Sequence, residues 1–321
     1  MYDWITASLD ITSHNHQEYI KKITTVSEIK TFYTNTTWSN GYLFNSKSGR
    51  KMGVSISEKR IKIRICPNKY ILGNNVQEAP IKNVLETFID ISNLLGLDLG
   101  LFVLEKLDIT HTAQTELIPE MYYPYLCNNK GFTRWNQDTS LYYKGNSIKV
   151  TKVFYDKINE VISSKKKTWG GRQKIPDHLM NKNLTRFECR LETNKEINKV
   201  IGCGGFLGQL FIDEHIEQLQ NWWWNQYNQI PKTTEMNWEF LKNMGEKKVK
   251  ETINFLSYNS LGRLNIEQLI ELAHRQGAFK HPSQKTRLKN DLLGRFNTYG
   301  KKHNHIKELD KKFKEIEVIW D

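Results

Sequence analysis

The sequence predicts an α+β fold, in which a central antiparallel sheet with flanking helices is followed by an all-helical C-terminal domain. Three observations lead to this prediction. Residues 61–65 alternate between isoleucine and a basic residue, as a strand with one buried face does. Residues 140–155 hold two strand-like runs around a turn at 144–147. From about residue 206 onward, apolar residues recur at helical spacing.

The expected elements follow in chain order. A helix is expected over 80–95, because Pro80 lies near its start and Gly96 just past its end. The expected strands lie at 1–12, 61–66, 101–112, 140–143, 149–155 and 184–192, and the segment 158–182 is polar and irregular. Further helices are expected at 206–228, 235–257, 265–276, 283–298 and 305–316. This change of pattern places a domain boundary after residue 204, which gives domains 1–204 and 205–321.

Charge and composition narrow the class of protein. The 321 residues carry 47 Lys and Arg against 35 Asp and Glu, and this net charge of +12 favours an acidic partner such as nucleic acid. An AT-rich genome, which raises the lysine content of every protein, would give the same excess. The 4 cysteines form no Cys-x-x-Cys pair, so a zinc site is not expected. Without a signal peptide or a membrane-length apolar run, we expect a soluble, cytoplasmic protein.

Two predicted strands carry acidic side chains that could bind a cation. Asp108 lies in a largely apolar strand, where a carboxylate needs a cation or a metal as its partner. Along 184–192, Arg186, Glu188 and Arg190 share one face, although an ordinary half-exposed strand has the same pattern. On neighbouring strands, Asp108 and Glu188 would offer the oxygen ligands that Mg²⁺ or Mn²⁺ prefers. His111 is a further candidate ligand, but a regular strand points it away from Asp108.

Tyr155 is a candidate nucleophile at the end of a predicted strand. A phenol is a poor nucleophile at neutral pH, because its pKa is about 10, and it needs a cation, a base or a metal beside it. Lys157 lies two residues further along the same strand face and could supply the cation. Glu160 could orient Lys157 or accept the phenolic proton. The alternative is a strand-end aromatic residue followed by a surface ion pair.

Other features lie outside these strands. His14 and His16 flank one polar residue, and for this segment a turn or loop is favoured over a metal-binding pair. The three tryptophans at 222–224 cannot share one helix face, so at least one is partly exposed, and packing is favoured over base stacking. The helix expected at 283–298 could contact duplex DNA or form a solvated basic face. Its basic residues are Lys285, Arg287, Lys289 and Arg295.

Three motifs occur in an order that resembles one family. They are Leu107-Asp108-Ile109, Tyr155-x-Lys157-x-x-Glu160 and Arg186-Phe187-Glu188, with the segment Pro67–Val76 ahead of them. Over residues 60–195 the chain resembles the replication initiators of filamentous phages, of the gene II protein type. It resembles the rolling-circle initiators of staphylococcal plasmids more distantly. The wider HUH-like group of nickases has a His–hydrophobe–His pair, which this sequence lacks in clear form.

The resemblance implies a rolling-circle replication initiator that nicks one strand at the origin and later joins strands. It implies Tyr155 as the nucleophile that forms a 5′-phosphotyrosine, and Asp108 and Glu188 as ligands of Mg²⁺ or Mn²⁺. Lys157, Glu160 and Arg186 are implied as assisting residues. Without a clear His–hydrophobe–His pair the metal shell is incomplete, and His111, His14 or His16 could complete it. The implied partners are duplex and single-stranded origin DNA and the helicase and polymerase of a bacterial host, with no membrane. Candidates for the second cleavage are Tyr142, Tyr143, Tyr299 and Tyr155 of another subunit in a homodimer.

Two other functions stay open from the sequence alone. A non-enzymatic origin-binding repressor would account for the basic helical part, and would bind DNA with a strong salt dependence but form no covalent adduct. A conjugative relaxase would use the same tyrosine chemistry in another process, although relaxases more often have a clear histidine cluster.

Overall fold

The computed structural model describes most of the first 236 residues and shorter segments after them. The described residues are 1–11, 13–24, 29–32, 41–45, 51–137, 139–163, 173, 175–202, 204–236, 270, 281–288, 290 and 300–315. The chain divides into two compact units, each of which is described by itself. Unit 1 contains residues 1–120, 131–229 and 313–321, and unit 2 contains residues 121–130 and 230–312.

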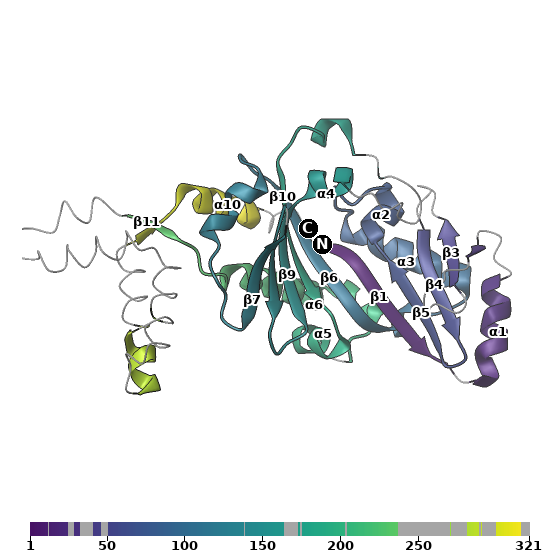
Figure 1. Ribbon diagram of the computed structural model, residues 1–321. Helices are drawn as coiled ribbons and strands as arrows, with labels where there is room; N and C mark the ends of the chain where they lie inside the picture. Colours follow the sequence, from purple (N-terminus) through teal and green to yellow (C-terminus); the bar gives the residue numbers. More distant parts are fainter. Residues whose placement is uncertain are drawn as a thin grey trace, which may run out of the picture. The chain divides into compact units, whose positions relative to one another are not determined.

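Unit 1 is built on a ten-stranded sheet in which every strand pairs with its neighbours in antiparallel fashion (Figure 1). The strand order is β2-β3-β4-β5-β1-β6-β10-β9-β8-β7. The strands are β1 (Tyr2–Asp10), β2 (Ile29–Phe32), β3 (Gly41–Asn45), β4 (Lys51–Ser57), β5 (Arg60–Ile65), β6 (Val103–Gln114), β7 (Phe132–Gln137), β8 (Ser140–Gly145), β9 (Val150–Asp156) and β10 (Leu184–Leu191). The prediction of a central antiparallel sheet is confirmed, and β2, β3, β4 and β7 are additions to it.

Helices cover one side of this sheet, which we call the helix face (Figure 1). They are α3 (Ile81–Leu95), α5 (Asn194–Ile201) and α6 (Asp213–Asn228), with the 3-10 turns η1 (Leu99–Leu101) and η5 (Leu207–Phe211). Phe187 of β10 is completely buried there, with ring centroids 4.4 Å from Phe154 and 5.2 Å from Trp223. The Trp223 indole nitrogen donates to the Phe187 carbonyl at 3.3 Å. An aromatic core therefore fixes α6 against the centre of the sheet.

The tryptophan run and the domain boundary can be judged from α6. Trp223 is buried, whereas Trp222 and Trp224 are half-buried, as expected for three adjacent residues on a helix that packs on one side only.

Helix α6 lies beyond residue 204, where we expected a second domain to begin, yet it packs on the sheet of unit 1. The amphipathic period of 206–228 was correct, but a period alone does not say which surface a helix covers.

Helix α3 ends at Gly96, as the sequence predicted, in a left-handed backbone conformation with φ of 62°. A Cβ added at Gly96 would meet no atom within 4 Å, so a substitution there is strained by the backbone alone. Gly96→Ala is expected to lower the free energy of unfolding by about 1–2 kcal/mol, measured by urea denaturation. Gly96→Asn, which adopts this conformation more readily, should lose less. Equal losses in both variants would contradict this explanation.

Helices α1 and α4 differ from the expectation. Helix α1 (Ser13–Thr24) contains His14 and His16, where we favoured a turn or loop, and the buried Ile23 anchors it. Helix α4 (Lys157–Ser163) lies within the segment that we considered irregular, because Asp156 Oδ1 accepts the Asn159 backbone N–H at 2.9 Å and caps the first turn. The others in unit 1 are α2 (Pro67–Leu72) and the 3-10 turn η4 (Asp177–Leu179), and η2 (Pro119–Met121) bridges to unit 2.

Unit 2 includes strands as well as helices. Its elements are η3 (Tyr123–Tyr125), β11 (Thr234–Met236), β12 (Gly300–Lys302) and α10 (Asn304–Lys314), whose last two residues belong to unit 1. β11 and β12 pair in antiparallel fashion, so the described part of this unit is not wholly helical, contrary to the prediction. Tyr125 stacks on His303 with ring centroids 4.0 Å apart. Of the helices expected at 235–257 and 265–276, the structure describes only residues 235 and 236, which belong to β11, and residue 270.

Candidate active site

The three motifs meet on the side of the sheet opposite to the helix face, which we call the polar face. Directly paired residues of antiparallel strands point to the same side. On this basis Glu188 shares the polar face with its partners Thr110 and Val153, and Arg186 shares it with Tyr155. Asp108 pairs with Arg190 and lies on the same face. Because β10 lies between β6 and β9, the strand order brings motifs far apart in sequence side by side.

Glu188 lies between the candidate nucleophile and a cation. Its Oε2 accepts a hydrogen bond from the Tyr155 hydroxyl at 2.8 Å, and its Oε1 accepts one from Arg190 Nε at 2.5 Å. Tyr155 is only 7 % exposed. Burial, and next the negative charge of Glu188, raise the pKa of the Tyr155 phenol well above its ordinary value, while the nearby Arg186 acts to lower it. The phenol is therefore protonated, and its hydroxyl is directed at the Glu188 carboxylate.

Asp108 and Glu188 are neighbouring carboxylates on the polar face of adjacent strands. Burial and the neighbouring Glu188 raise the pKa of Asp108 well above its ordinary value, although Arg190 acts to lower it. Thr110 is the direct partner of Glu188 and lies two residues from Asp108 on the same face, and its hydroxyl is buried with no hydrogen-bond partner among the described residues. Two carboxylates and a free hydroxyl oxygen fit Mg²⁺ or Mn²⁺, which take few protein ligands and complete their shell with water and phosphate. No group of three or more His, Cys, Asp or Glu that could enclose a metal occurs among the residues described.

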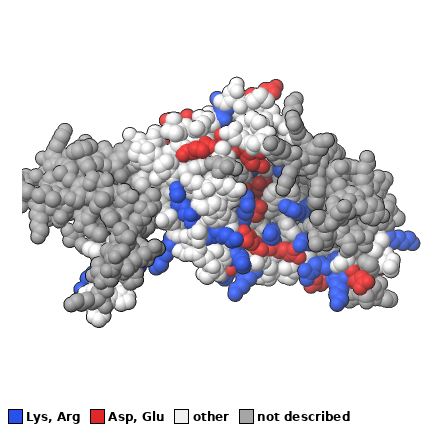
Figure 2. All heavy atoms as spheres, in the orientation of Figure 1, with Lys and Arg blue, Asp and Glu red and all other residues white. Residues whose placement is uncertain are grey.

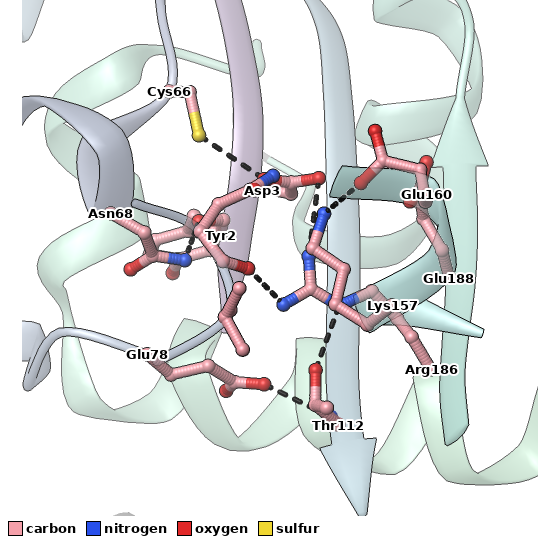
Figure 3. Close-up of polar contacts among 12 residues, drawn as sticks. Tyr2, Asp3, Cys66, Asn68, Glu78, Thr112, Lys157, Glu160, Arg186 and Glu188 are labelled. Carbon is pink, nitrogen blue, oxygen red and sulfur yellow. Dashed lines mark hydrogen bonds and ion pairs between the residues drawn. The ribbon is translucent and has the colours of Figure 1, made fainter. Parts of the chain in front are cut away.

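Arg186 is the buried centre of a polar network beside this pair. Its side chain is completely buried, and Nε donates to the Thr112 hydroxyl at 2.7 Å. The guanidinium also donates to the Asn75 carbonyl and lies 3.6 Å from Asp3 Oδ2. Burial would raise the pKa of Asp3, but the charges of Arg186 and Lys157 hold it well below its ordinary value. Figure 3 shows the Arg186 side chain near Asp3 and Thr112, and the Lys157 side chain directed at Glu160.

Lys157 does not lie on the strand face that we expected, because β9 ends at Asp156 and Lys157 is the first residue of α4. The turn into the helix keeps its side chain near Tyr155, with Nζ 5.6 Å from the centre of the Tyr155 ring. Nζ donates to Glu160 Oε2 at 2.7 Å, which is the orienting contact that we expected. Burial, and next the charge of Arg186, lower the pKa of Lys157.

Asp3 is a site residue that sequence reasoning missed. β1 pairs with β6 through Tyr2–Ile109 and Ile5–Leu107, so Asp3 and Trp4 together oppose the single residue Asp108. This irregularity is a β-bulge, which can redirect a side chain. Asp3 accepts hydrogen bonds from Asn75 at 2.8 Å and from Cys66 at 3.1 Å, and it is 3 % exposed. An aspartate in the first predicted strand was the available signal, but a bulge cannot be read from alternation alone.

His111 lies on the helix face and does not join Asp108 and Glu188. Its partner in β10 is Phe187, and its ring meets Trp223 edge to face at 5.4 Å. Its Nδ1 lies 3.2 Å from both carboxylate oxygens of Glu78, whose Oε1 also accepts the Thr112 backbone N–H at 3.1 Å. Burial lowers the pKa of His111 to about 3, so the ring is neutral. Because His111 contacts Trp223 of α6 and Glu78, we assign it a structural role in holding β6 to these two residues.

The other predicted residues are only partly described. Residues 282–288 are helical, Lys285 is half-buried and Arg287 is exposed, whereas Lys289 and Arg295 lie outside the described residues. Among the candidates for a second cleavage, Tyr142 lies on the polar face, because it pairs with Val153. Tyr143 points to the helix face and is completely buried, and Tyr299 lies outside the described residues. No helix in the described ranges is long and apolar enough to cross a membrane.

The comparison with known families agrees with the motifs. Residues 1–202 match the family model described as the N-terminal part of the replication-associated protein of the phage gene II type. Because the match covers more than half of the chain, the protein belongs to this family, and its members are rolling-circle replication initiators. Among curated proteins, none matches the chain. The match ends at residue 202, so it includes all the polar-face strands that carry the site and stops before α6.

Proposed function

We propose that the protein nicks one strand of origin DNA with Tyr155 and stays attached to the 5′ phosphate. The observation that carries this proposal is the hydrogen bond of 2.8 Å from the Tyr155 hydroxyl to Glu188. It joins a nucleophile to a proton acceptor on the adjacent strand, with the Arg186 cation in electrostatic range of the phenol. A structural tyrosine would also be hydrogen-bonded, but it would not need a second carboxylate, Asp108, on the same face.

The proposed step is a transesterification, in which one DNA phosphate passes from a 3′ oxygen to the Tyr155 oxygen. The Tyr155 oxygen attacks the phosphorus as its proton passes to Glu188, a bond forms between that oxygen and phosphorus, and the bond from phosphorus to the 3′ oxygen breaks. The 3′ oxygen leaves and takes up a proton, which gives a free 3′ hydroxyl. Rejoining reverses these changes: a 3′ hydroxyl attacks the phosphotyrosine and the phenol is released. Bond count is conserved, so the joining reaction needs no external energy source.

Cations around Tyr155 support this chemistry. The attacked phosphate gains negative charge on its oxygens as the new bond forms, and fixed positive groups stabilise that charge. Lys157 is held close to the Tyr155 ring by its hydrogen bond to Glu160. The half-exposed Arg190 side chain forms an ion pair with the Glu188 carboxylate. We assign Arg186 the task of positioning, because it donates to the Thr112 hydroxyl and the Asn75 carbonyl and lies 3.6 Å from Asp3 Oδ2. The host helicase and polymerase, the cytoplasmic location and a homodimer stay predictions.

A divalent ion is part of this proposal. Mg²⁺ or Mn²⁺ held by Asp108 and Glu188 would polarise the attacked phosphate and neutralise part of its charge. Asp108→Asn is expected to raise the Mn²⁺ concentration at which nicking is half-maximal by roughly 10–100-fold or more. The substitution should leave the free energy of unfolding unchanged or higher, because burial and Glu188 already disfavour the charged form of Asp108. Titration of Mn²⁺ into a nicking assay, with thermal unfolding alongside, measures both quantities, and an unchanged Mn²⁺ midpoint would remove Asp108 from the metal site.

One experiment tests the proposed function directly. The protein is incubated with Mn²⁺ and a supercoiled plasmid that carries the origin of its own replicon, digested with protease and examined by mass spectrometry. A nucleotide attached to the peptide that contains Tyr155 is the expected result. An adduct on another tyrosine, or nicked DNA with no protein attached, would overturn the proposal. Salt-sensitive binding without any nicking would favour the repressor instead.

A further inference from the structure

A pair of stacked aromatic side chains lies on the polar face close to the site. Trp135 of β7 and Tyr142 of β8 are direct partners across the two strands. Their ring centroids are 5.1 Å apart and their planes differ by only 8°, and both residues are half-buried. Because Tyr142 also pairs with Val153, the two rings lie on the same side of the sheet as Tyr155.

The distance from this pair to Tyr155 suits a nucleotide chain. Ser140 is the direct partner of Tyr155, so Tyr142 is its diagonal neighbour on the adjacent strand. Adjacent strands lie about 4.8 Å apart, which places Trp135 roughly two strand spacings, about 10 Å, from β9. A base resting on these rings would therefore be close to a phosphate held at Tyr155.

Basic side chains lie on the polar face on both sides of the carboxylates. Figure 2 shows Lys and Arg side chains around a strip of Asp and Glu side chains over the middle of the sheet. Lys144, exposed, pairs with Thr151 and lies on the aromatic side of the site. On the other side, Thr6 of β1 pairs with both Arg64 and Lys106, which are exposed.

Trp4, from the bulge, holds two of the cations on that second side. The Arg64 guanidinium lies 4.7 Å and the Lys69 ammonium 5.3 Å from the centre of the Trp4 ring. Such contacts fix long, mobile side chains in place without neutralising their charge. The second side of the site therefore presents positive charge to a phosphate, whereas the first presents flat aromatic surface.

We propose that single-stranded DNA crosses the polar face at right angles to the strands, with a base stacked on the Trp135–Tyr142 pair. Its phosphates are drawn toward Lys144 on one side of the site and toward Arg64 and Lys106 on the other. The inference rests on the proposed function, which requires an unpaired strand at Tyr155. Aromatic stacking combined with a basic surface is how proteins bind single strands of any sequence. Duplex DNA offers no free base faces, so the pair selects the unpaired form.

A cross-strand aromatic pair can also serve only to stabilise a hairpin. The chain offers a matched control, because Trp224 is half-buried and stacks on Tyr227 at 5.4 Å and 24° in α6, on the helix side of the sheet. Trp135→Ala and Trp224→Ala each remove one stacked tryptophan, but only the first lies on the polar face.

The test measures binding of a fluorescent oligothymidylate by fluorescence anisotropy, in full-length protein that carries Tyr155→Phe so that no cleavage occurs. Trp135→Ala is expected to weaken binding by roughly 5- to 150-fold, which corresponds to one lost base stack. Trp135→Phe should restore most of the affinity, and Trp224→Ala should bind as the parent does. Arg64→Gln and Lys144→Gln should each lower the slope of log affinity against log salt by about 0.7.

The outcome is independent of the nicking chemistry. Unchanged affinity in Trp135→Ala, or an equal loss in Trp224→Ala, would overturn the stacking site even if Tyr155 proves to be the nucleophile. Loss of affinity in Trp135→Ala alone would support the stacking site even if the adduct forms on another tyrosine. Thermal unfolding of each variant shows whether the hairpin of β7 and β8 is intact, and rescue by Trp135→Phe separates ring stacking from folding.

Discussion

Tyr155→Phe is expected to abolish nicking and the covalent adduct while origin binding is retained. The substitution removes one oxygen and keeps the ring that packs at the end of β9. Loss of an activated nucleophile typically lowers the rate of reaction by several orders of magnitude, and we expect a loss of at least about 10³-fold. Gel analysis of supercoiled origin DNA measures nicking, and a filter or mobility assay measures binding.

The same variant has a structural cost that must be separated from its chemical one. Glu188 is 2 % exposed, and without the Tyr155 hydroxyl its Oε2 loses a donor that is 2.8 Å away. A buried acceptor left without a partner costs about 1–3 kcal/mol, so the protein is expected to stay folded but to unfold at a lower temperature. Tyr143→Phe is the matched control, because Tyr143 is buried on the neighbouring strand but faces the helices. Full nicking by Tyr155→Phe, or equal loss in the control, would end the assignment.

Arg186→Leu is expected to have the largest effect on stability. Arg186 is completely buried, and its removal leaves the Asp3 carboxylate without its guanidinium partner in an interior site. Breaking a buried ion pair from one side costs about 3–5 kcal/mol, because the remaining charge has no compensation. Urea denaturation measures the change. Arg60→Leu is the control, since Arg60 and Asp10 form an exposed pair at 2.7 Å, for which a loss below about 1 kcal/mol is expected.

The effect of Arg186→Leu is expected to depend on pH. Arg186 and Lys157 hold the pKa of Asp3 below its ordinary value in the folded protein, whereas in the unfolded chain it is about 3.9. A lowered folded pKa contributes stability above the unfolded value and loses it as the pH falls through the folded value. The difference in stability between the unmodified protein and the variant should therefore be larger at pH 7 than at pH 3. A difference that does not vary with pH would show that lost packing, not the ion pair, causes the change.

Much of the fold of unit 1 was predictable from local pattern. Ile61, Ile63 and Ile65 are all completely buried, so strict alternation correctly identified β5, and the cap at Gly96 correctly ended α3. The short helix α4 escaped prediction because its cap, Asp156, belongs to the preceding strand. Unit 2 was harder, because a three-residue strand such as β11 has too few residues to show any period.

The site was predictable as far as alternation decides which side chains share a face. Arg186, Glu188 and Arg190 lie together as expected, and His111 points away from Asp108 as a regular strand requires. The pairing register and the strand order were not predictable, because they depend on contacts between distant parts of the chain. Asp3 was missed for the same reason: only the order β1-β6-β10 brings it to Arg186.

The order of strands also governs when a growing chain can assemble the proposed site. Asp3 on β1 precedes Tyr155 on β9 in the chain, and Arg186 and Glu188 follow on β10, which fills the gap between β6 and β9. Pairings between segments so far apart form slowly. A ribosome-bound fragment that ends before residue 184 therefore carries the tyrosine but lacks the residue to which its hydroxyl donates. Under the proposed function, such an unfinished copy has no complete nicking site.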